Sequence, residues 1–197
     1  MSSAWEFPTS LNIGGIDYEI RTDYRGVLDL LTALADPELL DTDERMTAYM
    51  QSKVMLEIMF PDFDNIPMEH WQEALEKLSE FIDMGVSDDR KKPKTMDWEQ
   101  DAPILIPAIN KVLNCEIRAQ KYMHWWTFLG AYMEIGESLF SNIIHIRQKK
   151  AKGKKLEKWE QEFYKENMSL IDFQQKPKRS EEEQALLRDY LFGHKKK

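Results

Sequence analysis

The chain has 197 residues, a formal net charge of −8 at neutral pH and a single cysteine, Cys115. An acidic balance argues against a general nucleic-acid-binding protein, because such proteins present a basic surface. One cysteine excludes an internal disulfide and a multi-cysteine zinc site. Hydrophobic residues make up 42% and charged residues 31% of the sequence, which is typical of a globular protein with a buried core. We find no signal peptide and no apolar run of membrane-spanning length, so we expect a cytoplasmic protein that does not bind membranes.

A short β-hairpin is predicted near the N-terminus, over residues 11–21. Apolar and polar residues alternate on both sides of the dipeptide Gly14-Gly15, which suits the tight turn of a two-residue hairpin loop. An isolated hairpin is only marginally stable in water. This hairpin must therefore lie against helices or pair with a strand of another chain, and the sequence leaves both arrangements open.

Helical apolar spacing dominates the rest of the chain, and local start and stop signals divide it. Asp23 is a candidate N-cap for a first helix, which Pro37 ends or kinks. Asp41 and Glu44 have the spacing of a capping box that opens a second helix. A third apolar stripe follows Pro67, a residue well suited to a first helical position.

The polar stretch 85–96 predicts a flexible internal loop between the two halves of the chain. Asp97 and Gln100 behind it again have capping-box spacing, but Pro103 and Pro107 both follow. Pro107 would lie one turn inside a helix that starts at residue 103. Either the start of this helix is shifted or the helix is kinked.

The most apolar stretch, residues 121–148, predicts one long central helix. Its large side chains would cover roughly half of the helix circumference, so several other helices must pack around it. Gly130 and Gly136 lower the stability of a helix interior, and we interpret them as sites of close helix approach or of a bend. The predicted apolar face consists of Trp125, Phe128, Leu129, Tyr132, Leu139, Ile143 and Ile146.

The C-terminal part combines a basic segment, one more apolar stripe and a short helix. Residues 147–158 hold seven basic residues and one acidic residue. Ser180 and Glu183 have capping-box spacing, so we expect residues 172–197 to comprise a short helix and a basic tail. The whole pattern predicts a mainly α protein: residues 1–197 form a single domain of about six to seven helices around the central helix, with the hairpin at its N-terminus.

The sequence contains no HExxH, P-loop, GxGxxG or GxSxG motif. Glu134, Glu137 and His145 are the nearest approach to a carboxylate metal site in a helix bundle. Such sites require a Glu-x-x-His motif on each of two helices, and this motif does not occur in the chain. We therefore expect no enzymatic activity, no cofactor and no metal.

The basic segment 147–158 has two interpretations. In the first, it binds RNA, DNA or an acidic protein surface. In the second, it is a solvated loop whose cations favour the end of the preceding helix, and the lack of interleaved aromatic residues disfavours base stacking. The aromatic residues that follow are core side chains or part of a partner surface. The candidate partner-binding residues are Lys154, Lys155, Trp159, Phe163 and Tyr164.

Several sequence blocks together resemble a phage protein family. They are IRTDYR at 20–25, DWEQD at 97–101, HWWTF at 124–128 and IIHIR at 143–147, and the basic segment with WEQEFYKEN at 159–167 extends the similarity. From about residue 11 to 170 the chain is similar to the Gp-fifteen-type proteins of siphophages and prophages of Gram-positive bacteria, which are encoded just before the tape-measure protein. The proline pair departs from the aromatic-rich pattern of that helix in the family.

The resemblance implies a tail assembly chaperone in the host cytoplasm. Such a protein binds the tape-measure protein, keeps it soluble, helps to recruit the tail-tube protein and is absent from the finished virion. A free strand edge of the hairpin would also allow self-association. The alternative is a nucleic-acid-associated phage factor that binds through residues 147–158, although nucleic acid is not the partner we expect. Residues expected to have structural roles are Asp97, Asp101, His124, Trp125, Trp126, Phe128 and Arg147.

Overall fold

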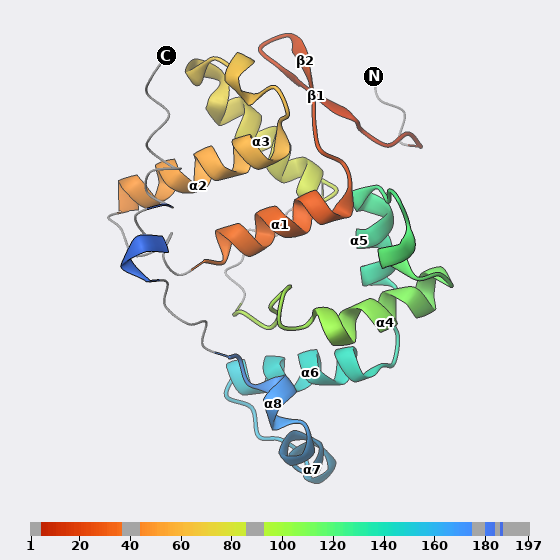
Figure 1. Ribbon diagram of the computed structural model, residues 1–197. Coiled ribbons are helices and arrows are strands. Elements are labelled where there is room, and N and C mark those ends of the chain that lie inside the picture. The colour runs from red at the N-terminus through yellow and green to blue at the C-terminus, as the bar shows by residue number, and fades with distance from the viewer. Residues whose placement is uncertain (1–4, 37–43, 86–92, 175–179, 184–185, 187–197) are drawn as a thin grey trace.

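Helices make up most of the fold, and a small hairpin precedes them (Figure 1). The computed structural model describes residues 5–36, 44–85, 93–174, 180–183 and 186. Its elements are β1 (Ser10–Ile13), β2 (Ile16–Glu19), α1 (Tyr24–Leu34), α2 (Glu44–Met59), the 3-10 helices η2 (Phe63–Asn65) and η3 (Met68–His70), α3 (Trp71–Ile82), α4 (Ala102–Leu113), the 3-10 helix η4 (Ile117–Ala119), α5 (Trp125–Met133), α6 (Leu139–Ala151), α7 (Lys158–Glu166) and α8 (Met168–Ile171). The prediction of a mainly α fold with an N-terminal hairpin is confirmed.

The hairpin turns at Gly14-Gly15, where both residues have positive φ, 59° and 84°. Glycine adopts this conformation without the steric cost that a side chain brings. The strands are antiparallel, with Ser10 opposite Glu19. The hairpin lies against helices: the N–H of Gly14 donates to the carboxylate of Glu73 on α3 at 3.0 Å. Helix packing therefore supplies the support that two strands alone lack.

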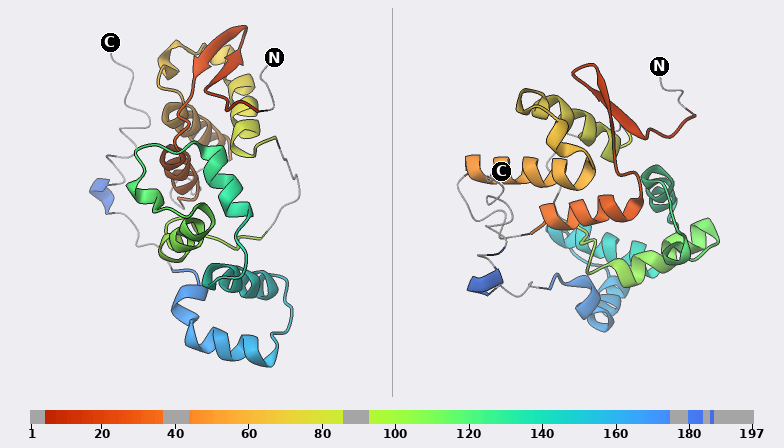
Figure 2. Two further views of the ribbon diagram at one scale, coloured as in Figure 1. Left: turned by 90° about the vertical axis from the view of Figure 1, so that its right-hand side faces the viewer. Right: turned by 45° about the horizontal axis from the view of Figure 1, so that its top comes forward.

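Helices α1, α2 and α3 pack together next to the hairpin (Figure 1 and Figure 2). Helix α1 begins after its N-cap Asp23, whose carboxylate accepts the N–H of Arg25 at 3.0 Å, as the sequence predicts. Helix α2 ends at Met59, and Asp41, the predicted cap at its start, lies outside the described residues. Fully buried side chains of these helices are Val27, Leu30, Leu56, Met59, Ala74 and Leu78.

The prediction of one long central helix over residues 121–148 is wrong. The stretch forms two helices, α5 and α6, separated by residues 134–138 (Figure 1). Ser138 caps α6: its hydroxyl accepts the N–H of Ser141 at 3.1 Å, and the Ser141 hydroxyl accepts the N–H of Ser138 at 2.9 Å. These bonds satisfy N–H groups that a continuous helix would pair with the preceding turn. The chain therefore starts a new helix at this point.

Neither glycine of this stretch is a site of close helix approach. A Cβ atom at Gly130 or Gly136 would meet no atom within 4 Å. Gly136 lies in the break, in agreement with its interpretation as a bend. The break also exposes the side chains beside it: Met133 is 57% exposed, and Leu139, which the helical pattern placed on the buried face, is 43% exposed.

Helix α4 begins at Ala102, one residue before the start considered at residue 103, and contains both prolines. Pro103 lies in the first turn and Pro107 lies inside the helix, and both are exposed. Pro107 removes one helical hydrogen bond, and its ring faces solvent. The loop predicted over residues 85–96 begins at Gly85, whose φ is 72° and whose N–H donates to the carbonyl of Glu80 on α3 at 2.8 Å. Residues 86–92 of this loop lie outside the described residues.

Helices α6, α7 and α8 form a smaller unit beside α4 (Figure 2). Ile143, Ile146 and Ile171 are the buried residues of its own apolar cluster. Of the C-terminal segment 172–197, the structure describes residues 172–174, 180–183 and 186, and it shows the predicted capping box of Ser180 and Glu183, with bonds of 2.9 and 3.2 Å. None of the helices among the described residues has the length and apolar character needed to span a membrane.

Candidate functional site

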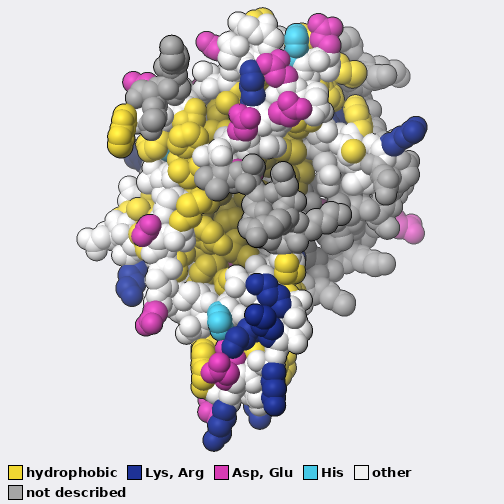
Figure 3. Space-filling model, turned by 180° about the vertical axis from the view of Figure 1, so that it is seen from behind, with side chains coloured by type: hydrophobic (Ala, Val, Ile, Leu, Met, Phe, Trp, Pro, Cys, Tyr) yellow, Lys and Arg dark blue, Asp and Glu magenta, His cyan; other side chains and the backbone are white. Residues whose placement is uncertain are grey.

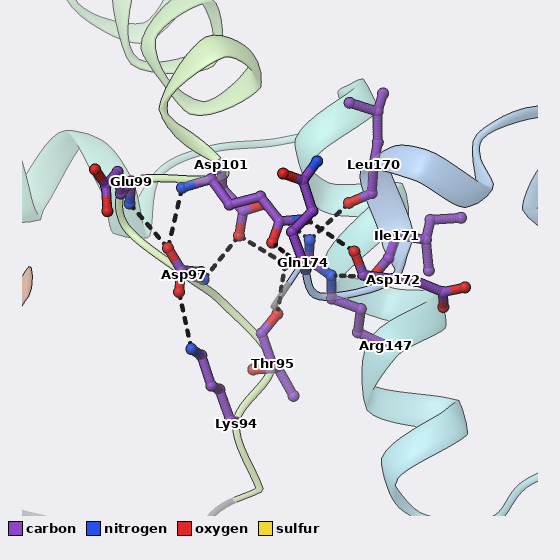
Figure 4. A network of polar contacts seen from close by, with 11 residues as sticks. Lys94, Thr95, Asp97, Glu99, Asp101, Arg147, Leu170, Ile171, Asp172 and Gln174 are labelled. Carbon is purple, nitrogen blue, oxygen red and sulfur yellow. Dashed lines mark hydrogen bonds and ion pairs between the residues drawn. The ribbon is translucent and has the colours of Figure 1, made fainter. Parts of the chain in front are cut away.

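Asp101 and Arg147 form a buried ion pair that joins the start of α4 to α6 (Figure 4). The guanidinium binds the carboxylate through two hydrogen bonds, Nη1 to Oδ2 at 2.6 Å and Nη2 to Oδ1 at 2.8 Å. Its other N–H groups donate to three backbone carbonyls: Nε to Ile171 at 2.7 Å, Nη2 to Leu170 at 2.7 Å and Nη1 to Thr95 at 3.2 Å. All five guanidinium donors are therefore used, which is the condition under which a buried charge is tolerated.

Asp97 extends this contact toward the start of α4 (Figure 4). Its N–H donates to Asp101 Oδ2 at 2.9 Å, and its own carboxylate accepts the N–H groups of Glu99 at 3.2 Å and Gln100 at 3.0 Å. Asp97 thus caps the turn that leads into α4, and the same turn presents Asp101 to Arg147.

Gln100 and Phe173 tie the chain after α8 to the same place. The amide of Gln100 donates to the carbonyl of Asp172 at 2.9 Å and accepts the N–H of Gln174 at 3.0 Å. The Phe173 ring lies 4.3 Å from the guanidinium carbon of Arg147, at cation–π distance. We call Asp97, Gln100, Asp101 and Arg147 the polar anchor. Sequence analysis named all four residues, with Gln100 as the capping-box partner of Asp97. Only the Asp97 half of that box forms, because the N–H of Asp97 donates to Asp101 and the Gln100 side chain binds backbone groups of Asp172 and Gln174, which leave no signal in the residue types.

His124 is the N-cap of α5. Its Nδ1 accepts the N–H of Trp126 at 3.1 Å, so the ring proton is on Nε2, which donates to the carbonyl of Pro8 at 3.1 Å. The Phe7 ring stacks on the imidazole, with ring centroids 4.3 Å apart. Burial lowers the pKa of His124 below its ordinary value. A neutral imidazole with both nitrogens engaged is a structural group, and here it holds the N-terminal segment on α5.

The two tryptophans after His124 join α5 to the end of α3. Trp125 Nε1 donates to the carbonyl of Ile82, and Trp126 Nε1 donates to that of Phe81, both at 2.8 Å. Trp125 is fully buried and stacks on Phe128, with ring centroids 5.6 Å apart. The HWWTF block is therefore part of the core.

The IRTDYR block lies beside the HWWTF block. The N–H of Trp125 donates to the carbonyl of Thr22 at 2.7 Å, and the N–H of Tyr24 donates to that of Met123 at 2.9 Å. Asp23 adds a second role to its capping, because its Oδ2 accepts the N–H of Met123 at 3.1 Å. Sequence analysis found the cap and missed this pairing, since the capping signal already accounted for an aspartate at this position.

The basic segment 147–158 divides into cations with internal partners and cations that face solvent. Besides Arg147, Lys149 pairs with Glu160 at 2.5 Å, and Lys150 pairs with Asp172 at 2.6 Å. The remaining cations are exposed, and their side chains have no partner among the residues that the structure describes; they are Lys152, Lys154, Lys155 and Lys158.

The aromatic candidates on α7 also divide. Trp159 is 49% exposed. Phe163 and Tyr164 are half-buried against the small apolar cluster, and the Tyr164 hydroxyl donates to Asp172 at 2.7 Å. Of the candidate partner-binding residues, Lys154, Lys155 and Trp159 are therefore available at the surface, whereas Phe163 and Tyr164 mainly pack inward.

One protein family matches most of the chain. The sequence model described as bacteriophage Gp15 protein matches residues 5–172. The chain belongs to the bacteriophage Gp15 protein family. A search of curated proteins and a search of solved structures found no match.

The range matched to the Gp15 family contains every block that carried the sequence resemblance. It also contains the His124 contacts and the whole polar anchor, and it ends one residue before Phe173. The predicted resemblance to a phage family of this type is confirmed, and the chain is a bacteriophage protein.

In this Gp15 family member, Glu160 is a buried carboxylate that sequence analysis missed. It accepts hydrogen bonds from Lys149 at 2.5 Å, from His145 Nε2 at 2.9 Å and from the N–H of Glu157 at 2.6 Å. The hydrogen bond from Lys149 is the main cause that lowers the pKa of Glu160 to about 2. The capping-box spacing of Glu157 and Glu160 is the signal that could have identified this residue.

Replacing Glu160 by glutamine is expected to make the stability of the fold depend less on pH under acidic conditions. The folded-state pKa of about 2 lies below the unfolded value of about 4.3, so the carboxylate stabilises the fold above pH of about 4.3 and loses this effect as the pH falls toward 2. Between about pH 6 and pH 3, the urea midpoint of the wild type should therefore fall more than that of E160Q, as followed by circular dichroism. The variant E162Q, changed at an exposed position of the same helix, should keep the wild-type profile. Parallel profiles for wild type and E160Q would contradict the lowered pKa.

The Gp15 family member also carries apolar side chains at its surface. Figure 3 shows hydrophobic side chains gathered across the middle of the face opposite to the view of Figure 1. Met133 and Leu139, on the two sides of the α5–α6 break, are exposed. Exposed apolar side chains that lie close together are candidate contacts for another molecule.

The described residues contain no cluster of three or more His, Cys, Asp or Glu side chains that could hold a metal ion. Cys115 is a free, partly buried thiol. The contacts described above position helices and backbone segments relative to one another. What the site offers chemically is hydrogen bonding, ion pairing and apolar contact.

Proposed function

We propose that this protein is a tail assembly chaperone of a siphophage or prophage of Gram-positive bacteria. In this role it binds the tape-measure protein, keeps it soluble and helps to recruit the tail-tube protein. It acts in the host cytoplasm, is absent from the finished virion, and works without catalysis or a cofactor. Membership of the Gp15 family supports a bacteriophage protein, and the resemblance to proteins encoded just before the tape-measure protein supports the assembly role.

The observation that carries the proposal is the pair of exposed apolar side chains at the α5–α6 break, Met133 and Leu139. A tape-measure protein presents long apolar helix faces, and an amphipathic helix binds best to a groove or surface that covers such a face. Met133 is exposed here, and the flexible thioether side chain of methionine adapts to different apolar partners along a long helix. The net charge of −8 keeps the complex soluble.

Coexpression with a tape-measure fragment tests the proposal. Size-exclusion chromatography with light scattering should show a soluble fragment that elutes with several copies of this protein. The variant M133E should reduce the recovered complex at least tenfold, because it places a charge in the apolar contact. The variant V112E is the matched control, since Val112 is also exposed, lies near the end of a different helix and should tolerate the charge. A fragment that precipitates with or without the protein would refute the chaperone role.

The alternative function, a nucleic-acid-associated phage factor acting through residues 147–158, has weaker support. Three of the seven cations in this segment are held in internal ion pairs, by Asp101, Glu160 and Asp172. A mobility shift with short RNA or duplex DNA at about 150 mM salt tests it, because backbone-driven binding falls steeply with salt.

A further inference from the structure

Charged side chains of opposite sign gather at opposite ends of the molecule. Residues 60–85 hold seven acidic residues and one basic residue, whereas residues 147–158 hold seven basic residues and one acidic residue. Figure 1 and Figure 2 place α3 and the hairpin at one end, and α7 with its connection to α6 at the other. Figure 3 shows mostly acidic side chains around the top of the molecule and mostly Lys and Arg side chains at the bottom, where a few acidic side chains lie among them. Positive and negative charges are thus concentrated at different ends of the protein, although its net charge is negative.

The cations at one end are available for binding. After the internal ion pairs are formed, four exposed lysines remain without a side-chain partner in the described part of the chain. Trp159 follows them at the start of α7, and 49% of its surface is exposed. Tryptophan is enriched among the central residues of protein interfaces, and charged side chains are typical of the rim around them. We call this surface the basic tip; it consists of Lys152, Lys154, Lys155, Lys158 and Trp159.

The opposite end has the complementary composition. Asp62 and Asp64 are exposed, and no cation among the described residues pairs with either of them. Met68, in η3 between η2 and α3, is 70% exposed. Each end therefore offers one large apolar side chain beside charges that are mostly of one sign, although Trp159 itself donates to the exposed Glu157 at 3.2 Å. We call this second surface the acidic end; it consists of Asp62, Asp64 and Met68.

We propose that the basic tip of one copy of this chain docks on the acidic end of a second copy. Because the two surfaces lie at opposite ends, the contact is heterologous, and every added copy leaves one basic tip and one acidic end free. The copies therefore add head to tail. Complementary charges set the orientation and raise the rate of encounter, while Trp159 and Met68 supply the apolar part of the contact. A linear array of copies could cover a long helical partner. Only this statement about the partner rests on the proposed function; the self-association does not.

The charge distribution favours a second copy over a nucleic acid as the occupant of the basic tip. Four free lysines neutralise at most about four phosphates, so the number of counterions released on binding a nucleic acid would be small. The acidic remainder of the chain repels a polyanion, whereas another copy brings a matching acidic end at the same concentration. Solvent-exposed charges are screened by salt, so the contact should be weak and strongly dependent on ionic strength.

Sedimentation equilibrium of the isolated protein tests the proposal. At about 0.01 M salt, where the Debye length is about 30 Å, the weight-average mass should rise with protein concentration beyond that of a dimer. At about 1 M salt, where the Debye length is about 3 Å, it should fall to the mass of one chain. The variants K154E/K155E and D62K/D64K should each lower the association constant at least tenfold. A one-to-one mixture of the two should associate again, because the intact basic tip of D62K/D64K fits the intact acidic end of K154E/K155E, and the two reversed surfaces again carry opposite charges.

Matched variants control for net charge and folding. K111E/K121E makes the same change in charge as K154E/K155E at exposed positions away from both ends, and E134K/E137K does so for D62K/D64K. The association constants of both controls should lie within about twofold of the wild-type value, and all variants should keep the wild-type circular dichroism spectrum. A monomer at low salt, a mass that stops at the dimer, or a mixture that fails to associate would each overturn the proposal. So would a mobility shift of RNA or DNA that K154E/K155E abolishes while self-association persists.

Discussion

Replacing Arg147 by methionine is expected to lower the free energy of unfolding by about 3–5 kcal/mol, because it leaves a buried carboxylate without its cation. The Asp101 carboxylate is 0% exposed, and the carbonyls of Leu170 and Ile171 lose their guanidinium donors as well. For a chain of this length, the loss corresponds to a fall in Tm of roughly 10 °C. Urea and thermal unfolding followed by circular dichroism measure both quantities.

Two further variants show whether the buried charge is the cause. The double variant R147M/D101L should recover part of the lost stability, since it removes the stranded carboxylate together with its partner. R118M breaks the exposed Arg118–Glu116 pair, whose closest atoms are 2.8 Å apart, and it should leave Tm unchanged within error. If R147M were as mild as R118M, the polar anchor would not be what holds α4, α6 and the end of α8 together.

Replacing Trp125 by alanine is expected to destabilise the protein by about 3–5 kcal/mol, the range found when large aromatic residues are removed from a core. The indole is 1% exposed, stacks on Phe128 and donates to the carbonyl of Ile82 at 2.8 Å. Truncation would leave a cavity between α5 and α3 and an acceptor without its donor. A urea titration at 25 °C gives the difference in free energy of unfolding.

The exposed Trp159 supplies the control for this measurement. W159A removes the same side chain from a position that is 49% exposed, so the urea midpoint should change little. W125F should recover much of the apolar contact and none of the hydrogen bond, and should fall between the wild type and W125A. Equal midpoints for W125A and W159A would contradict the buried position of Trp125.

Elements stabilised by contacts close in sequence were predicted well. The Gly14-Gly15 turn, the Asp23 cap and the Ser180–Glu183 capping box each depend on residues at most a few positions apart, and each is present in the structure. Their residue types alone specify the local backbone. This is why a sequence without any structural information was enough to predict them.

The break between α5 and α6 shows where apolar periodicity fails. The spacing of apolar residues over 121–148 fits one helix, but the mutual hydrogen bonds of Ser138 and Ser141 favour a new helix start. Periodicity reports which residues are buried and does not distinguish one long helix from two shorter ones. The error also placed Leu139 in the core, although it lies at the surface.

The polar anchor was predicted in part. The sequence blocks identified Asp101 and Arg147 as structural residues, but their pairing joins positions 46 residues apart. The remaining acceptors of Arg147 are backbone carbonyls, which any residue type provides. The same holds for the basic segment, where the positions of Glu160 and Asp172 determine which lysines are neutralised.

Helical class, hairpin and caps thus follow from residue type and short-range spacing, and the sequence blocks already point to the phage family. The division of helices in the apolar centre, the burial of Asp101 with Arg147 and the set of lysines left at the surface depend on segments far apart in the chain. Whether a charge is buried with a partner or remains hydrated is a property of its surroundings. Those surroundings exist only after the distant segments have packed together.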